Sequence, residues 1–184
     1  MDPKQVIVIA VALVFLLAIA WVLVRKQRTL NLRKRFGQEY DVAVRESGPQ
    51  RAESALLERE KRVGGFSIRE LSTQEYEGFQ TEWRAIQSHF VDDPGSAVSE
   101  ADLLVDRLVQ ARGYPASDFE QRAADISVQH PQLVANYRAA YQIAEQHRQG
   151  QAGTEELRNA LIYYRSLFDE LLQKGLTVRT KEVA

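Results

Sequence analysis

The run of nineteen apolar residues from Val6 to Val24 constrains this chain more than any other feature of its sequence. It contains no charged residue, no Gly and no Pro. At about 1.5 Å per residue, a helix of this length spans roughly 28 Å, close to the ~30 Å hydrocarbon core of a bilayer. A helix also satisfies its own backbone hydrogen bonds, as lipid requires. The sequence therefore predicts a transmembrane helix over residues 6–24, after a short flank at residues 1–5.

A cluster of basic residues follows the apolar run directly. Residues 25–35 carry six positive charges, whereas Lys4 is the single basic side chain before the run. By the positive-inside rule, this asymmetry places the N-terminus outside and the larger part of the chain in the cytoplasm. An indole near the end of the run suits the boundary between lipid and water. The residues that we assign to topology and lipid contact are Trp21, Arg25, Lys26, Arg28, Arg33, Lys34 and Arg35.

The basic segment 25–35 has two interpretations. Six cations attract anionic lipid head groups, at about 1 kcal/mol per charge near the membrane surface. The simpler interpretation is that these charges only fix the topology of the anchor. Both interpretations make the lipid bilayer a partner of the chain.

A cleaved secretory signal is the alternative to a retained anchor. Ala18, Ile19 and Ala20 resemble the small-residue pattern of a cleavage site, and cleavage would leave a secreted or periplasmic domain. However, the apolar run is long, the residues before it carry little positive charge, and the basic cluster lies on the wrong side of it for export. We therefore expect the anchor to be retained.

Charge and cysteine content exclude several classes of function. Residues 36–184 carry 17 basic and 24 acidic side chains, so this part of the chain repels phosphate and nucleic acid is not an expected partner. The chain has no Cys, which removes disulfide scaffolds, Cys-ligated zinc, iron–sulfur clusters and thiol nucleophiles.

Apolar residues beyond the basic segment recur with the helical period of about 3.6. We expect a peripheral helical or linker region at 36–71, with helices near 39–46 and 49–63. A bundle of four to five antiparallel helices should follow at 72–174, because helices joined by short loops pack as antiparallel neighbours. The predicted fold class is all-α: a single N-terminal transmembrane helix, then this bundle, then an unpatterned tail at 175–184.

Helix starts are marked by capping residues. Ser72 and Glu75 have the spacing of a capping box, and Asp93 with Pro94 marks another start. Ser117 to Glu120 predicts a second capping box, and Thr154 is the expected cap of the last helix.

The helix after Ser72 carries an aromatic stripe at helical spacing. Such stripes are usually core, and aromatic residues later in the chain can face them, although a cofactor or lipid pocket is the alternative. The members of the stripe are Tyr76, Phe79, Trp83 and Phe90.

No catalytic residue can be assigned, and no cofactor is expected, because no phosphate-binding loop, dinucleotide fingerprint or nucleophile elbow is present. His89, Asp92 and Asp93 are the candidate metal ligands or acid–base pair, but helix capping explains them more simply. Asp102 and Asp106 lie one turn apart beside Arg107, which predicts a solvated face.

Several phrases of the sequence resemble a family of uncharacterised bacterial proteins. The phrases are RFGQEYD at 35–41, FVDDP at 90–94, RGYP at 112–115, DFEQRAAD at 118–125, HP at 130–131, YR at 137–138 and YYRSLF at 163–168. The resemblance covers about residues 31–173. It implies a bacterial membrane or secreted protein with an N-terminal hydrophobic segment, and it brings no activity, cofactor or catalytic residue.

Together these features predict a non-enzymatic protein of a bacterial inner membrane whose helical domain binds other proteins as an interaction or scaffold module. One alternative is an accessory subunit of a larger membrane complex, for example a respiratory or photosynthetic one. Another alternative, from a different class, is a ligand- or metal-binding sensor or enzyme that uses His89, Asp92 and Asp93.

Overall fold

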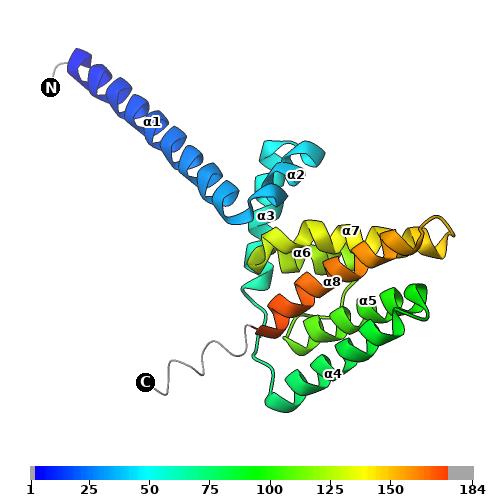
Figure 1. Ribbon diagram of the computed structural model, residues 1–184. Helices are drawn as coiled ribbons and strands as arrows, with labels where there is room; N and C mark the ends of the chain where they lie inside the picture. The colour runs from blue at the N-terminus through cyan, green and yellow to red at the C-terminus, as the bar shows by residue number, and fades with distance from the viewer. Residues whose placement is uncertain (1–2, 174–184) are drawn as a thin grey trace. The chain divides into compact units, whose positions relative to one another are not determined.

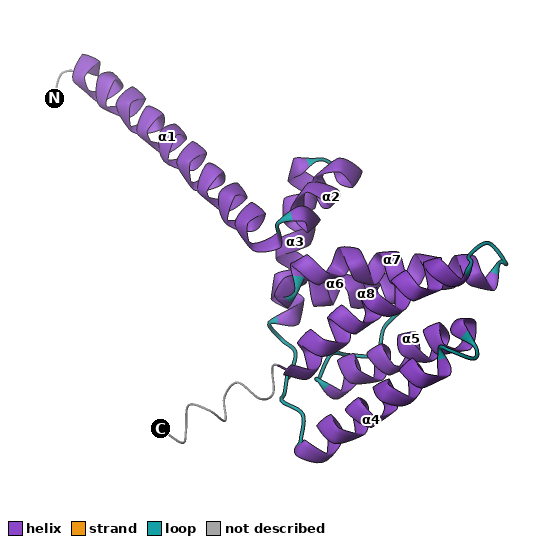
Figure 2. Cartoon of the chain, in the orientation of Figure 1, coloured by secondary structure: helices purple, strands orange, loops and turns teal. Residues whose placement is uncertain are grey.

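The computed structural model describes residues 3–173, with the side chains of Leu13 and of residues 15–173. Within this part the chain forms eight α-helices and no strand, which confirms the predicted all-α class (Figure 1, Figure 2). The predicted tail at 175–184 lies outside the described residues. The chain divides into two compact units, Met1–Leu57 and Glu58–Ala184, and the boundary falls inside a helix.

Helix α1 (Pro3–Phe36) joins the predicted apolar and basic segments in one unbroken helix of 34 residues. It ends at Gly37, whose φ of +53° favours glycine and whose N–H donates to the carbonyl of Arg33. Among the described residues, none of the helices combines the length and the hydropathy that a membrane crossing requires. Part of the predicted run Val6–Val24 lies outside the described side chains.

The first unit contains α2 (Gln38–Ser47) and the first half of α3 (Pro49–Val63), together with α1. Both short helices begin and end within one residue of the predicted ranges. A polar link joins all three helices, because Glu53 Oε1 accepts hydrogen bonds from Thr29 Oγ1 at 2.7 Å and from Tyr40 Oη at 3.1 Å. The buried apolar side chains of this unit are Leu32, Phe36, Tyr40, Ala43, Ala52 and Leu56.

The second unit contains five complete helices, as the bundle prediction required. They are α4 (Thr73–His89), α5 (Pro94–Ala111), α6 (Phe119–Gln129), α7 (Pro131–Arg148) and α8 (Thr154–Gln173). Short connections make α4 and α5 one antiparallel hairpin and α7 and α8 another (Figure 1). The two hairpins pack through α5 and α8, and α6 lies against α7.

Helix α4 begins with the predicted capping box. Glu75 N–H donates to Ser72 Oγ, and Ser72 N–H donates to Glu75 Oε2 at 2.8 Å. The guanidinium of Arg69 and the Ser72 amide lower the pKa of Glu75 to about 2. Asp93 caps α5 as predicted, since its Oδ1 accepts a hydrogen bond from Ser96 N–H.

Two predicted caps are wrong by one residue. The cap of α6 is Asp118 and not Ser117, and its Oδ1 accepts a hydrogen bond from Gln121 N–H at 2.8 Å. Thr154 is the first helical residue of α8 and not its cap; the preceding Gly153 donates its N–H to the side chain of Glu156. In both places two adjacent residues are competent caps, Ser117 with Asp118 and Gly153 with Thr154.

The core of the second unit is built on aromatic contacts. Trp83 of α4 stacks on Phe168 of α8, with ring centroids 4.7 Å apart. Tyr137 of α7 meets Tyr164 of α8 edge to face at 6.1 Å. The predicted stripe of α4 therefore belongs to the core: Trp83 is buried, and Tyr76, Phe79 and Phe90 pack partly buried against it.

The segment between α3 and α4 also packs on this core, through Phe66, Ile68 and Leu71. Its approach depends on Gly113, which has a φ of +96° and lies against the backbone of Ser67. A Cβ atom at this position would come within 2.2 Å of the Ser67 carbonyl oxygen. The last part of the predicted peripheral region is thus held to the bundle.

Candidate functional site

The residues predicted to contact lipid lie on the C-terminal half of α1. Trp21 is 62% exposed, and the guanidinium carbon of Arg25 lies 5.3 Å from the centre of its ring, which is a cation–π contact. Arg33 pairs with Asp41 of α2 at 3.4 Å. All six predicted basic side chains are exposed: Arg25, Lys26, Arg28, Arg33, Lys34 and Arg35.

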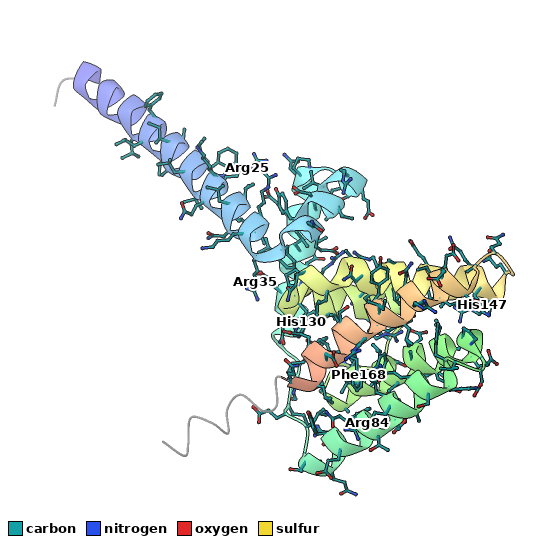
Figure 3. All side chains as sticks on the ribbon, in the orientation of Figure 1. Arg25, Arg35, Arg84, His130, His147 and Phe168 are labelled. Atoms are coloured by element: carbon teal, nitrogen blue, oxygen red, sulfur yellow. The ribbon has the colours of Figure 1, made fainter. Side chains whose placement is uncertain are left out.

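A groove of about 280 Å³ opens between α1 and the first turns of α3. The α1 side supplies the end of the apolar run and two cations, and the α3 side supplies uncharged polar groups and one carboxylate. Figure 3 shows Arg25 on the side of α1 that faces α3. The lining residues are Trp21, Val24, Arg25, Arg28, Gln50, Glu53 and Ser54.

Two of the three predicted metal or acid–base residues have other partners in the structure. His89 Nδ1 lies 3.1 Å from Glu100 Oε1 on α5, while Asp93 is engaged in capping α5. The Ser96 amide lowers the pKa of Asp93 and keeps it ionised. Asp92 is exposed in the turn between α4 and α5. Across the described residues, no group of three or more potential ligands is placed to hold a metal ion.

A buried polar cluster in the second unit was not predicted. Arg122 of α6 is only 8% exposed; its Nε donates to Tyr137 Oη at 2.7 Å, and its Nη1 donates to Asp106 Oδ1 at 2.7 Å. The same Nη1 reaches the carbonyl of Ser117 at 3.2 Å. The expected solvated face at Asp102 and Asp106 is therefore wrong. Asp106 forms an ion pair with Arg122, which is 16 residues further along the chain, and the Asp106 side chain is 29% exposed.

Asp102 is the second carboxyl group of this cluster. Its Oδ1 atom is buried, and burial raises its pKa although the Tyr164 hydroxyl and the Arg122 guanidinium oppose the shift. Burial also raises the pKa of Tyr137 and of Tyr164, so both hydroxyls stay protonated. The cluster thus places two carboxyl groups beside one guanidinium and two phenols, and Asp102 is the carboxyl group whose pKa burial raises.

One sequence signal could have revealed the cluster. Arg122 follows Phe119 by three residues and precedes Ile126 by four, so it lies on the apolar stripe of its helix. An arginine in that position needs a buried acceptor. Asp102 and Asp106, one turn apart, were the carboxylates available to accept hydrogen bonds from this arginine.

A second buried arginine lies at the end of α5. Arg112 is 5% exposed, and burial lowers its pKa. It neighbours Tyr114, whose pKa burial raises to about 12, and Tyr114 meets Phe66 edge to face at 6.1 Å. Arg112 also accepts a hydrogen bond from Arg69 N–H at its carbonyl oxygen. This site braces the segment that leads into α4.

We expect Asp102→Asn to stabilise the chain at neutral pH. The pKa of Asp102 is higher in the folded than in the unfolded chain, so the folded state binds more protons between the two values. Stability therefore falls as pH rises through this window, and it stays lowered above it. Urea unfolding followed by circular dichroism should show the variant more stable than wild type at neutral pH, with the difference shrinking as the pH is lowered through the window.

The control is Asp92→Asn, which removes an exposed carboxyl group from the α4–α5 turn. It should leave the stability and its pH dependence near those of wild type. An Asp102→Asn chain that is less stable than wild type at neutral pH would show that the ionised carboxylate is needed by Tyr164 or Arg122.

No protein-family model, curated protein or solved structure matches the chain. The roles considered next rest on its own residues.

Proposed function

We propose that the chain is a single-pass protein of a bacterial inner membrane that holds a helical domain at the cytoplasmic face, where the domain binds other proteins. The observation that carries the proposal is the continuity of α1, in which the basic segment directly extends the apolar run. A cationic segment joined rigidly to an apolar helix is typical of a membrane anchor with its basic end in the cytoplasm.

A face of the second unit supports the binding of another protein. Leu103 of α5 is 64% exposed and lines an open groove of about 360 Å³ together with Ala85 and Ile86 of α4. Polar contacts between α4 and α5 border this apolar centre: an ion pair of Glu82 with Arg107, and a hydrogen bond between His89 and Glu100. An apolar centre inside a polar rim is the usual composition of a protein interface. The groove between two antiparallel helices fits an amphipathic helix of a neighbouring membrane protein.

The membrane topology of the chain and its resistance to alkaline extraction test the proposed anchor. Green fluorescent protein fused after Ala184 should be fluorescent in cells, because it folds in the cytoplasm, and the full chain should stay in the membrane after alkaline extraction. Alkaline phosphatase at the same position should be inactive. Release of the chain by alkali, or an active phosphatase fusion, would contradict the proposed topology.

Site-specific photo-crosslinking tests the partner. A photoreactive residue at Leu103 of the full chain, in native membranes, should crosslink to a second membrane protein. The same residue at Arg158, which is exposed on α8, serves as the control. Crosslinks only to other copies of the chain, or equal yields at the two positions, would contradict a binding face at Leu103.

A further inference from the structure

The groove between α1 and α3 has the chemistry of a phosphate-binding site. Arg25 and Arg28 supply two guanidinium groups, which form strong charge-assisted hydrogen bonds to phosphate oxygens. Trp21 holds Arg25 by the cation–π contact at 5.3 Å. The Arg25 side chain is therefore partly ordered before a ligand binds, which lowers the entropy cost of binding. Gln50 and Ser54 face them from α3 with uncharged hydrogen-bonding groups.

One negative charge also lines the groove. Glu53 Oε1 accepts the hydrogen bonds of Thr29 and Tyr40, which fix the carboxylate towards the core of the first unit. Against Arg25 and Arg28 it leaves one net positive charge in the groove. This balance matches the single charge of a phosphodiester. A choline or ethanolamine head group would bring a further cation beside two arginines.

The position of the groove along α1 matches the depth of lipid phosphates. Val24, the last residue of the apolar run, lines one edge of the groove. At about 1.5 Å per residue, Arg25 and Arg28 lie roughly 1.5 and 6 Å beyond Val24 along the helix. The head-group layer begins at the edge of the hydrocarbon core and is about 5–7 Å deep on each side. The backbone positions of both arginines therefore lie at the depth of that layer.

We propose that this groove binds the head group of an anionic glycerophospholipid, with the phosphodiester between Arg25 and Arg28 and the uncharged glycerol hydroxyls on Gln50 and Ser54. The inference rests on the proposed membrane anchor, and it adds a defined site to what would otherwise be diffuse attraction by the basic segment.

The test compares lipid selectivity of the full chain reconstituted in vesicles of equal parts phosphatidylglycerol and phosphatidylcholine. Spin-labelled forms of the two lipids report which one associates with the protein. Wild type should prefer phosphatidylglycerol, and Arg25→Gln with Arg28→Gln should reduce that preference by about fivefold per arginine. The matched control, Lys26→Gln with Lys34→Gln, removes the same charge outside the groove and should keep most of the preference.

A third variant separates the groove from charge alone. Gln50→Leu with Ser54→Ala leaves the net charge unchanged, and it should lower the preference for phosphatidylglycerol over phosphatidylcholine. Equal losses in the arginine and lysine variants would overturn the site in favour of diffuse attraction, as would an unaltered preference in the third variant. Alkaline extraction of the same vesicles tests the anchor separately: a chain that resists extraction but shows no groove-dependent selectivity refutes only the site.

Discussion

Replacing Arg122 by Met should lower the free energy of unfolding by about 3–5 kcal/mol. The substitution keeps much of the side-chain volume but removes the guanidinium that binds Asp106 and Tyr137. A partly buried carboxylate and a buried hydroxyl would then lose their partner, and that loss outweighs the gain from the apolar replacement. Urea unfolding of the full chain in detergent, followed by circular dichroism, measures the difference.

Two further variants make this result interpretable. Arg84→Met removes an arginine whose side chain is exposed on α4 (Figure 3), and it should change the stability by less than about 0.5 kcal/mol. Arg122→Met combined with Asp106→Leu removes both charges of the ion pair, and it should recover most of the loss. If Arg122→Met alone were as stable as wild type, the cluster would not contribute to the folding of the second unit.

Phe168→Ala should lower the free energy of unfolding by about 3–5 kcal/mol. Phe168 is 1% exposed and stacks on Trp83, so its removal leaves a cavity between α4 and α8 and takes away an aromatic contact. The same unfolding measurement applies. Because Trp83 loses its stacking partner, the emission maximum of its fluorescence should also shift in the folded variant.

The matched control for Phe168→Ala is Leu103→Ala, which truncates a large apolar residue that is already 64% exposed. Its effect on the free energy of unfolding should stay below about 0.5 kcal/mol, because little buried surface is lost. Similar losses in the two variants would mean that the core of the second unit is not organised around the α4–α8 contact.

Local signals explain why the helices could be predicted from the sequence. A cap acts within three residues, so Ser72 with Glu75, and Asp93 with Pro94, specify where α4 and α5 begin. The apolar period then identifies the buried face of each helix, as it did for Trp83. Both kinds of signal depend on neighbours along the chain, and the sequence contains them completely.

The polar cluster could not be predicted in the same way. Asp106 and Arg122 are 16 residues apart and lie on different helices, so their pairing depends on how α5 and α6 pack. Beside Arg107, two aspartates one turn apart look like an exposed face. The contact of His89 is a related case, because Glu100, the side chain that meets it, comes from the neighbouring helix.

The boundary between the two units was also invisible in the sequence. It falls after Leu57, inside the unbroken helix α3, where no Gly or Pro interrupts the pattern. The predicted start of the bundle was residue 72, where the capping box of α4 gives a strong local signal. Contacts distant in sequence, such as Thr29 with Glu53, hold the first half of α3 to α1.

The link from Thr29 and Tyr40 to Glu53 has a mechanical consequence. The carboxylate of Glu53, which also lines the groove at Trp21, joins α1, α2 and α3, so it limits the rotation of α1 against the other two helices. If α1 spans the bilayer as proposed, any tilt of α1 in the bilayer would also tilt α2 and the start of α3, because the three helices are joined at Glu53.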